Sequence, residues 1–284
     1  ASAQNRDDGS PAELMGMGDN KRASVWGPAA LYLNPAGLIR TRAVLFGVDY
    51  GYLAGKDGHS FGVSAVDAQT NQYAAMAVAY DYIVSAPGGE DVDGNQFRGG
   101  VATMYQGGSV GVYAGVGLRY LGLEVGKDDD ESTETNDIDA WTVDAGLIFD
   151  IAGRIRLGLV GSNLIDTGTD RAAREFGAGL SFVFDQLEIT GDMSVDLADR
   201  LESPISRYGF GAEYIVDQLI ALRAGFTIDQ ITAQEHLSFG LGYASPDVAV
   251  DLGYTTAVDG DANAAFGVSI RYRPIQSGKG GRRR

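Results

Sequence analysis

The chain has 284 residues, a formal net charge of −16, no cysteine and a mean hydropathy of −0.08. The lack of cysteine excludes disulfides, thiol catalysis and cysteine-ligated metals, and the negative charge argues against nucleic acid, because a phosphate backbone would be repelled. No run approaches the roughly 18 apolar residues of a transmembrane helix, so a membrane crossing would need strands, in which only alternate side chains are apolar.

Residues 1–42 show no strand alternation, whereas from Ala43 onward apolar residues recur at every second position, as in the run from Phe266 to Tyr272. A period of two is the signature of strands. None of the seven prolines lies inside such a run, as expected where each interior N–H donates to a neighbouring strand. The predicted strands are 43–54, 60–67, 72–84, 96–105, 109–125, 138–150, 155–163, 175–184, 187–195, 206–214, 220–227, 235–243, 248–255 and 263–273.

The connections between successive predicted strands alternate between a short set and a set that is mostly longer. The brief set is 68–71, 106–108, 151–154, 185–186, 216–218 and 244–247, and the longer set is 55–59, 85–95, 126–137, 164–174, 196–205, 228–234 and 256–262. Outer-membrane barrels have short periplasmic turns and longer outside loops. We therefore predict an all-β fold, a fourteen-stranded antiparallel transmembrane up-and-down β-barrel in the bacterial outer membrane, with both termini periplasmic.

Three regions follow from this pattern: an N-terminal hatch or plug segment in the lumen (1–42), the transmembrane barrel (43–273) and a basic periplasmic tail (274–284). The start Ala1-Ser2-Ala3-Gln4 is the kind expected of a mature chain after removal of an export signal.

Aromatic residues on the outward face form two predicted girdles around a band of aliphatic side chains, as membrane interfaces require. The alternative is a soluble sandwich whose aromatics fill its core. The outer girdle comprises Tyr50, Tyr52, Tyr82, Phe97, Tyr120, Trp141, Phe176, Tyr208, Tyr254 and Phe266, and the inner girdle Tyr105, Phe149, Phe184, Tyr214, Tyr243 and Tyr272.

The other set of alternate positions should face the lumen and is rich in glycine, which leaves room for residues 1–42. Its charges have both signs: Asp49, Arg119, Asp144, Arg156, Asp192, Glu213, Arg223, Asp251, Arg271 and Arg273. A simple hairpin at 126–137 would set Arg119 directly opposite Asp144, and Glu213 and Arg223 would be diagonal partners. Balanced charges favour pairs that hold a polar lumen together and anchor a plug over an ion-selectivity ring.

The segment before the first strand carries a family resemblance. Gly16-Met17-Gly18, followed by the run from Ala30 to Leu38 (ALYLNPAGL), resembles the start of the FadL-like outer-membrane barrels, whose superfamily includes the PorV-like barrels of secretion systems. The run from Gly158 to Leu164 (GLVGSNL) resembles a strand-end feature of the PorV-like branch.

The resemblance implies a hatch folded into the lumen, with Asn34, Pro35, Ala36 and Gly37 as its hatch positions. Asn34-Pro35 suits a sharp turn, and Gly37 would tolerate a positive φ. No substrate-binding residue is carried over.

By resemblance, FadL-type members pass hydrophobic molecules through the barrel wall, whereas PorV-like members hold other proteins at the outer membrane. Short loops and a polar, glycine-rich inward face favour the second function, because a pocket for a hydrophobic ligand is lined mostly by apolar side chains. We therefore expect a plugged barrel, surrounded by outer-membrane lipid and lipopolysaccharide, that acts as an anchor or scaffold for partner proteins in a membrane complex.

The alternative is a passive channel for small hydrophobic molecules, which an apolar tunnel or a wall gap near the third strand would favour. A general porin would need an open lumen.

No other motif indicates chemistry. The acidic run Asp128–Glu131 lacks the turn glycine of an EF-hand, so it reads as a solvated loop, with weak divalent-ion binding as the alternative. His59 and His236 are isolated, and Glu235 and His236 would point to opposite faces of a strand, so neither a metal site nor a catalytic triad is assembled. We predict no enzymatic activity, no cofactor and no metal.

Overall fold

The computed structural model describes residues 10–54, 58–85, 90–127, 137–169, 172–197, 205–230, 233–258 and 264–274. The first nine residues, the acidic run at 128–131 and most of the predicted basic tail therefore lie outside the described residues.

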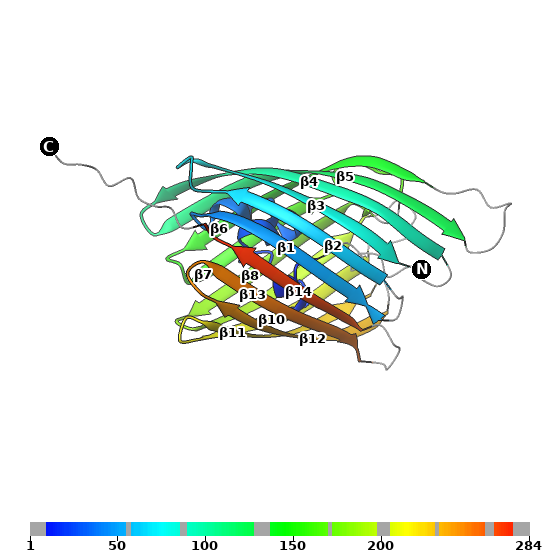
Figure 1. Ribbon diagram of the computed structural model, residues 1–284. Helices are drawn as coiled ribbons and strands as arrows, with labels where there is room; N and C mark the ends of the chain where they lie inside the picture. The colour runs from blue at the N-terminus through cyan, green and yellow to red at the C-terminus, as the bar shows by residue number, and fades with distance from the viewer. Residues whose placement is uncertain are drawn as a thin grey trace.

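Fourteen antiparallel strands form a closed barrel in which each strand pairs with its neighbours in sequence and β1 pairs with β14 (Figure 1). The strands are β1 (Val44–Leu53), β2 (Gly58–Asp67), β3 (Ala74–Ser85), β4 (Glu90–Gly107), β5 (Val110–Lys127), β6 (Ile138–Ile151), β7 (Ile155–Ser162), β8 (Glu175–Phe184), β9 (Leu187–Asp196), β10 (Ile205–Val216), β11 (Ile220–Asp229), β12 (Gln234–Ala244), β13 (Val248–Ala257) and β14 (Ala265–Tyr272). The predicted fold class is confirmed.

The two ends of the barrel differ in their connections. The turn end carries 68–73, 108–109, 152–154, 185–186, 217–219 and 245–247, and the loop end carries 54–57, 86–89, 128–137, 163–174, 197–204, 230–233 and 258–264. Positive φ angles at Ala152, Asp185 and Asp217 form the tight turns that join twisted strands.

One predicted loop was largely wrong. β4 begins at Glu90, so most of 85–95 is strand and pairs with the far end of β5, from Glu90 opposite Lys127 onward. The strands β3 to β6 consequently form a taller wall at the loop end than the rest of the barrel (Figure 1).

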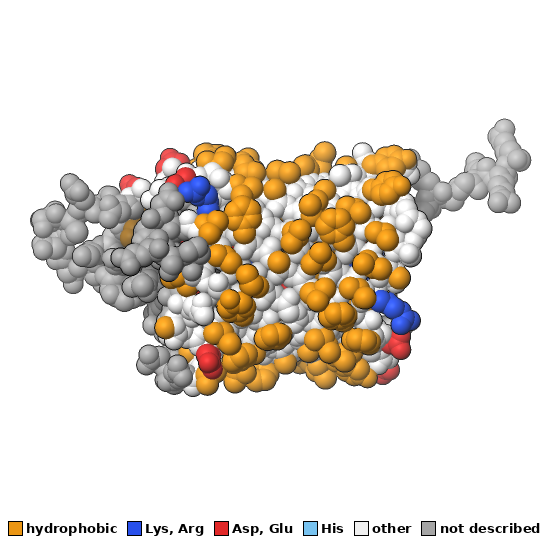
Figure 2. Space-filling model, turned by 180° about the vertical axis from the view of Figure 1, so that it is seen from behind, with side chains coloured by type: hydrophobic (Ala, Val, Ile, Leu, Met, Phe, Trp, Pro, Cys, Tyr) orange, Lys and Arg blue, Asp and Glu red, His pale blue; other side chains and the backbone are white. Residues whose placement is uncertain are grey.

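Outward side chains form an apolar belt, as the large exposed residues Phe61, Trp141 and Phe239 illustrate. Figure 2 shows these hydrophobic side chains spread over the barrel wall, with the charged side chains near its two ends. Such a belt matches the hydrocarbon layer that a membrane barrel must face. No described helix has the length and apolarity needed to cross a membrane.

The N-terminal segment, residues 10–43, lies inside the barrel (Figure 1). It contains α1 (Ala12–Met15), η1 (Gly27–Ala29), α2 (Ala30–Leu33) and η2 (Pro35–Ile39). Its backbone comes so close to the inner wall that a Cβ on three glycines would overlap it: Gly115 at Pro35, Gly225 at Met17 and Gly253 at Ala12. These three inward glycines are therefore required by the close approach of two backbones.

This close approach generates a test with a matched control. A Cβ added to Gly146 would overlap the side-chain oxygen of Asn34, whereas a Cβ at the neighbouring inward Gly117 would find its nearest atom at an ordinary 3.5 Å. We expect Gly146→Ala to lower the free energy of unfolding by about 1–3 kcal/mol because of overpacking, and Gly117→Ala to leave it within about 0.5 kcal/mol. Urea unfolding in lipid vesicles measures both; equal losses would contradict the described seating of Asn34.

Candidate functional site

The Asn34 side chain fastens the N-terminal segment to the wall. Its Nδ2 donates to the carbonyl of Arg22 at 2.9 Å and lies 3.4 Å from the carbonyls of Leu147 on β6 and Leu159 on β7. Its Oδ1 accepts from the backbone N–H of Ala36 at 3.1 Å, which caps η2. One buried amide therefore joins two parts of the segment to two strands.

The other three predicted hatch positions lie beside it in η2. Pro35 and Ala36 cover Gly115 of β5. Gly37 does not adopt the positive φ that a glycine would tolerate, since it is not among the described glycines with positive φ. Gly37 is needed for a different reason: a Cβ there would overlap the carbonyl of Val25.

Six side chains form a chain of alternating charge, which we call the charge ladder. Four belong to the wall, and the two terminal ones, Glu13 and Lys21, belong to the N-terminal segment. In order, the contacts are Glu13–Arg271 (2.6 Å), Arg271–Asp251 (2.6 Å), Asp251–Arg223 (2.6 Å), Arg223–Glu213 (2.5 Å) and Glu213–Lys21 (3.4 Å). All six side chains are at least nine-tenths buried. Every charge therefore has a partner of opposite sign, which buried charges require.

The ladder crosses β12 without a side chain from that strand. Where the ladder passes, the inward positions of β12 are Gly240 and Gly242. A Cβ on Gly242 would lie 2.5 Å from Asp251 Oδ1 and 2.9 Å from Arg223 Nη1. Glu213 and Arg223 are directly opposite in the register of β10 and β11, so the predicted diagonal arrangement was wrong. The Trp26 ring covers Arg271 at 4.5 Å, a cation–π contact.

The remaining predicted lumen charges lie apart from the ladder. Asp192 accepts from the backbone N–H of Arg22 at 2.9 Å, and the Arg22 guanidinium also pairs with Glu175 at 2.7 Å. Asp49 accepts from the hydroxyl of Ser269. At the turn end, Arg156 pairs with Asp150 (2.9 Å) and Glu188 (3.5 Å), and Arg273, beyond β14, is exposed.

The predicted opposition of Arg119 and Asp144 was wrong. The register sets Arg119 opposite Thr142, and Asp144 opposite Gly117. Asn163 lies near both: its backbone N–H donates to Asp144 at 2.7 Å, and its side-chain oxygen lies 3.5 Å from Arg119 Nη1.

Sequence reasoning missed one buried cluster. Asp81 of β3 pairs with Arg98 of β4 at 2.6 Å, the Arg98 guanidinium lies over the Tyr32 ring at 4.4 Å, and the Tyr32 hydroxyl donates to Asp81 at 2.8 Å. Burial and the neighbouring Asp81 carboxylate raise the pKa of the Tyr32 phenol well above its ordinary value, so it remains a donor. Strand parity would have shown Asp81 and Arg98 as inward, since each alternates with outward aromatic residues.

Arg40 fixes the end of the N-terminal segment nearest β1. Its Nη1 donates to the carbonyl of Val25 at 3.0 Å and to that of Ser24. Burial, with some repulsion from Arg156, lowers the pKa of the Arg40 guanidinium to about 10, so it remains charged at neutral pH.

The inner face of the tall wall is apolar at the loop end. The sequence had predicted a polar, glycine-rich inward face and did not indicate these apolar residues. Leu121 and Leu123 of β5 are buried beneath Ala172 of the 163–174 connection, with Ile138 of β6 beside them. Ile83 of β3 and Val92 of β4 are also buried near this end. We call these residues the apolar layer.

Below the apolar layer lies a small inner pocket of about 100 Å³ between the N-terminal segment and the wall. Leu31, Tyr32 and Leu33 contribute apolar surface from the segment. Its wall residues include Arg98, Arg119, Asp144, Ser162, Asn163 and Glu175.

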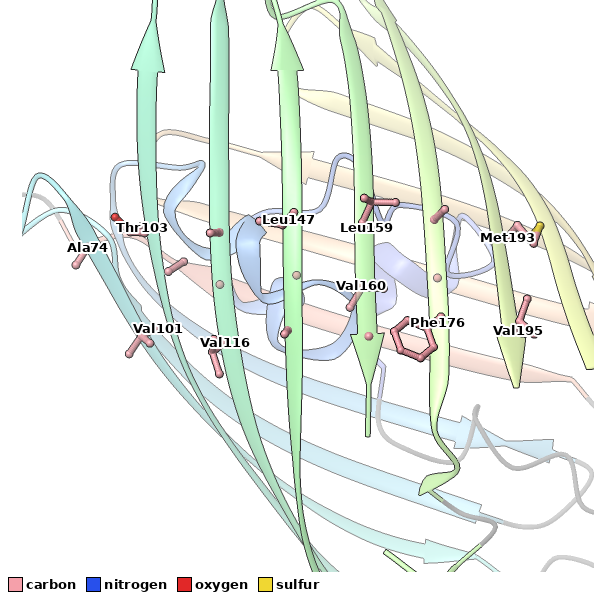
Figure 3. A pocket seen from close by; sticks show the side chains of 18 residues that line it. Ala74, Val101, Thr103, Val116, Leu147, Leu159, Val160, Phe176, Met193 and Val195 are labelled. Carbon is pink, nitrogen blue, oxygen red and sulfur yellow. The ribbon is translucent and has the colours of Figure 1, made fainter. Parts of the chain in front are cut away.

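A much larger groove of about 890 Å³ lies on the outer surface of β3 to β9 (Figure 3). Its rim carries large apolar side chains such as Leu147, Leu159 and Phe176, and its floor consists of alanine and glycine, among them Ala145, Gly161 and Ala178. Directly behind this floor, inside the barrel, Asn34 and Pro35 contact Gly146. The wall is thin here because small residues line both of its faces.

The groove and the inner pocket lie on opposite faces of the wall at the loop end of β7 and β8. Gly161 lines the groove and the next residue, Ser162, lines the pocket; likewise Phe176 lines the groove and Glu175 the pocket. Pairing of β6 with β7 covers only Ala145–Ile151 of β6.

Beyond that pairing, two hydrogen bonds join β6 to the residues that follow β7. The Leu164 N–H donates to the carbonyl of Val143 (2.8 Å), and the Thr142 hydroxyl donates to the carbonyl of Ile165 (2.9 Å). We call this place the seam. By contrast, β3 is paired along both edges, with β2 and with β4, so the wall is continuous there.

Solved structures resemble this barrel over its whole length. The Ralstonia pickettii toluene transporter TbuX has 15% identity and a TM-score of 0.69, covering 95% of this chain and 100% of that chain. The Pseudomonas putida toluene transporter TodX has 14% identity and a TM-score of 0.64, covering 94% and 98%. A Pseudomonas aeruginosa FadL homologue has 12% identity and a TM-score of 0.64, covering 93% and 98%.

The fold is thus that of a FadL-like outer-membrane barrel, as the resemblance implied. No protein-family model matches the sequence, and no curated protein matches it. Two of these similar structures are described as toluene transporters.

The charge ladder predicts a large effect from its central cation. Replacing Arg223 by Met leaves Glu213 and Asp251 without their strongest shared partner in a buried site, so we expect the free energy of unfolding to fall by about 3–5 kcal/mol. Arg154→Met, at an exposed turn residue, is the control and should change it by less than about 0.5 kcal/mol. Denaturant titration in vesicles distinguishes the two variants. An unchanged free energy of unfolding in Arg223→Met would contradict the stabilising role of the charge ladder.

Proposed function

We propose that this protein is an outer-membrane channel for passive uptake of small hydrophobic molecules, which leave the barrel sideways through the seam. The loop end faces the outside and both termini are periplasmic. The observation that carries the proposal is that the apolar groove and the inner pocket lie on opposite faces of the same stretch of wall, at Gly161 and Ser162, next to the point where β6 stops pairing with β7.

The entrance of this route is the apolar layer. Leu121 and Leu123 lie buried beneath Ala172, and an apolar solute that takes the place of Ala172 on them gains the free energy of leaving water. The inner pocket follows, with Leu31, Tyr32 and Leu33 on its segment side. Polar groups on the wall side of the pocket are mutually paired, as in the contact of Asn163 with Asp144, which reduces their competition for water.

The exit is favoured by the chemistry of the groove. Its lining is almost entirely apolar and opens on the outward face of the barrel, so a hydrophobic solute would pass into lipid without meeting water. The N-terminal segment supports this direction, because η2 and Asn34 occupy the lumen behind the groove floor and would act as a plug against straight passage.

The similar solved structures include two toluene transporters, which supports a small hydrocarbon as the solute class. The anchoring of partner proteins stays a prediction, since no contact of the described residues favours it over transport.

A blocked groove tests the route. Ala178 lies on the groove floor on β8, and Ala224 is an outward, exposed alanine on β11 outside the groove. We expect Ala178→Trp to abolish protein-dependent uptake of radiolabelled toluene into liposomes, because the indole fills the exit, and Ala224→Trp to leave uptake unchanged. Equal uptake by both variants would exclude the sideways route, and no uptake by the unsubstituted protein would exclude the function.

A further inference from the structure

The arginine side chains that line the inner pocket are engaged by acceptors of the chain itself. The contacts are Arg22–Glu175 (2.7 Å), Arg98–Asp81 (2.6 Å), Arg207–Asp19 (3.7 Å) and Arg119 with the side-chain oxygen of Gln96 (2.8 Å). An anionic solute would have to break one of these contacts and would lie beside the carboxylates of Asp144 and Glu175, which also line the pocket. Because like charges in close contact cost free energy, the pocket suits a neutral solute.

Two polar atoms of the pocket wall remain after this pairing. Asp144 Oδ1 accepts from the Asn163 N–H at 2.7 Å, but within the described part of the chain neither Asp144 Oδ2 nor the Ser162 hydroxyl has a hydrogen-bond partner. Both residues are partly buried. They lie close together, since Ser162 directly precedes Asn163. The wall therefore offers a carboxyl oxygen and a hydroxyl in one place.

The segment side of the pocket is apolar, through Leu14, Leu31 and Leu33 and the ring of Tyr32. The Tyr32 hydroxyl adds no free polar group, because it donates to Asp81 at 2.8 Å. The pocket volume is about 100 Å³, below the roughly 150 Å³ of an apolar cavity that holds benzene. A solute here is therefore small, with at most one ring.

The two remaining polar atoms decide which small solute is favoured. Without a solute they are free to bond to water. A plain hydrocarbon would displace that water and leave Asp144 Oδ2 and the Ser162 hydroxyl without partners, which costs affinity. A solute hydroxyl replaces both bonds, because it donates to the carboxyl oxygen and accepts from the serine. Sites built to bond a hydroxyl reject analogues that lack it.

We propose that the inner pocket selects small neutral phenols and alcohols. Their hydroxyl bonds to Asp144 and Ser162, and their hydrocarbon part lies against Leu31 and Leu33. This assignment rests on the proposed function and names the solute class of its inner pocket.

Three solutes that share a methyl-substituted ring test the assignment: toluene, p-cresol and p-methylbenzoate. At neutral pH p-cresol is neutral, since a phenol titrates near about pH 10, whereas p-methylbenzoate is an anion. Equilibrium dialysis against the full chain in lipid nanodiscs measures binding, and empty nanodiscs correct for partition into lipid. We expect p-cresol to bind, and p-methylbenzoate to bind at least about tenfold more weakly.

A double substitution locates the hydroxyl site. Asp144→Asn with Ser162→Ala removes both free polar atoms, while the new amide oxygen still accepts from the Asn163 N–H. We expect the ratio of p-cresol affinity to toluene affinity to fall at least about tenfold. The control, Asp150→Asn with Ser181→Ala, makes the same two changes at turn-end residues outside the pocket lining and should leave the ratio unchanged. Heat-modifiable gel mobility of the barrel checks the folding of each variant.

The outcomes separate the solute class from the channel function. An unchanged ratio in the folded double variant, or no binding of p-cresol to the unsubstituted protein, would overturn the assignment. So would tight binding of p-methylbenzoate that is lost in Arg119→Gln, because the pocket would then be an anion site. Toluene uptake into liposomes tests the channel itself: uptake that persists alongside an unchanged ratio would retain the channel and reject only the solute class.

Discussion

The structure depends on one constraint, the close approach of two backbones inside a closed sheet. A barrel in lipid must pair its strand backbones with one another, which leaves side-chain alternation as the only means of distinguishing its two faces. Outward positions are apolar, and inward positions such as Gly115, Gly225 and Gly253 have no side chain where the N-terminal segment touches them. The N-terminal segment fits in the lumen because those inward positions are empty, and the charge ladder crosses β12 for the same reason, over Gly240 and Gly242.

The same constraint explains why polar and apolar functions occupy different sectors of one barrel. On β4 to β8 small residues on both faces make the wall thin, so that the outer groove lies just in front of Asn34. On β10 to β14 the space left by glycine on β12 lets Arg223 reach Asp251 across a strand. One sector thus suits a hydrophobic solute moving toward lipid, and the other suits charges that hold the N-terminal segment.

Much of the fold could be predicted from the sequence, because a period of two is a local property. β8 begins and ends at the predicted residues, Glu175 and Phe184. The start of β4 was missed because Glu90, Asp91 and Gly94 resemble a loop in composition, while their pairing with β5 decides the conformation. Registers were less accessible: Arg119 lies opposite Thr142 rather than Asp144, and the alternation along each strand does not determine such an offset between two strands. Contacts between non-adjacent strands, such as Arg223 with Asp251, and the packing of Ala172 on Leu121 have no sequence signal.

The central claim is that a hydrophobic solute leaves the lumen at the seam. Photo-cross-linking with a diazirine-bearing benzene derivative, followed by mass spectrometry of the labelled peptides, tests it in the unsubstituted protein within liposomes. Labels should concentrate on the loop-end residues of β7 and β8 and on the groove, around Ser162, Asn163 and Phe176. Labels confined to the inner face at the turn end, or spread evenly over the lipid-facing belt, would contradict the claim.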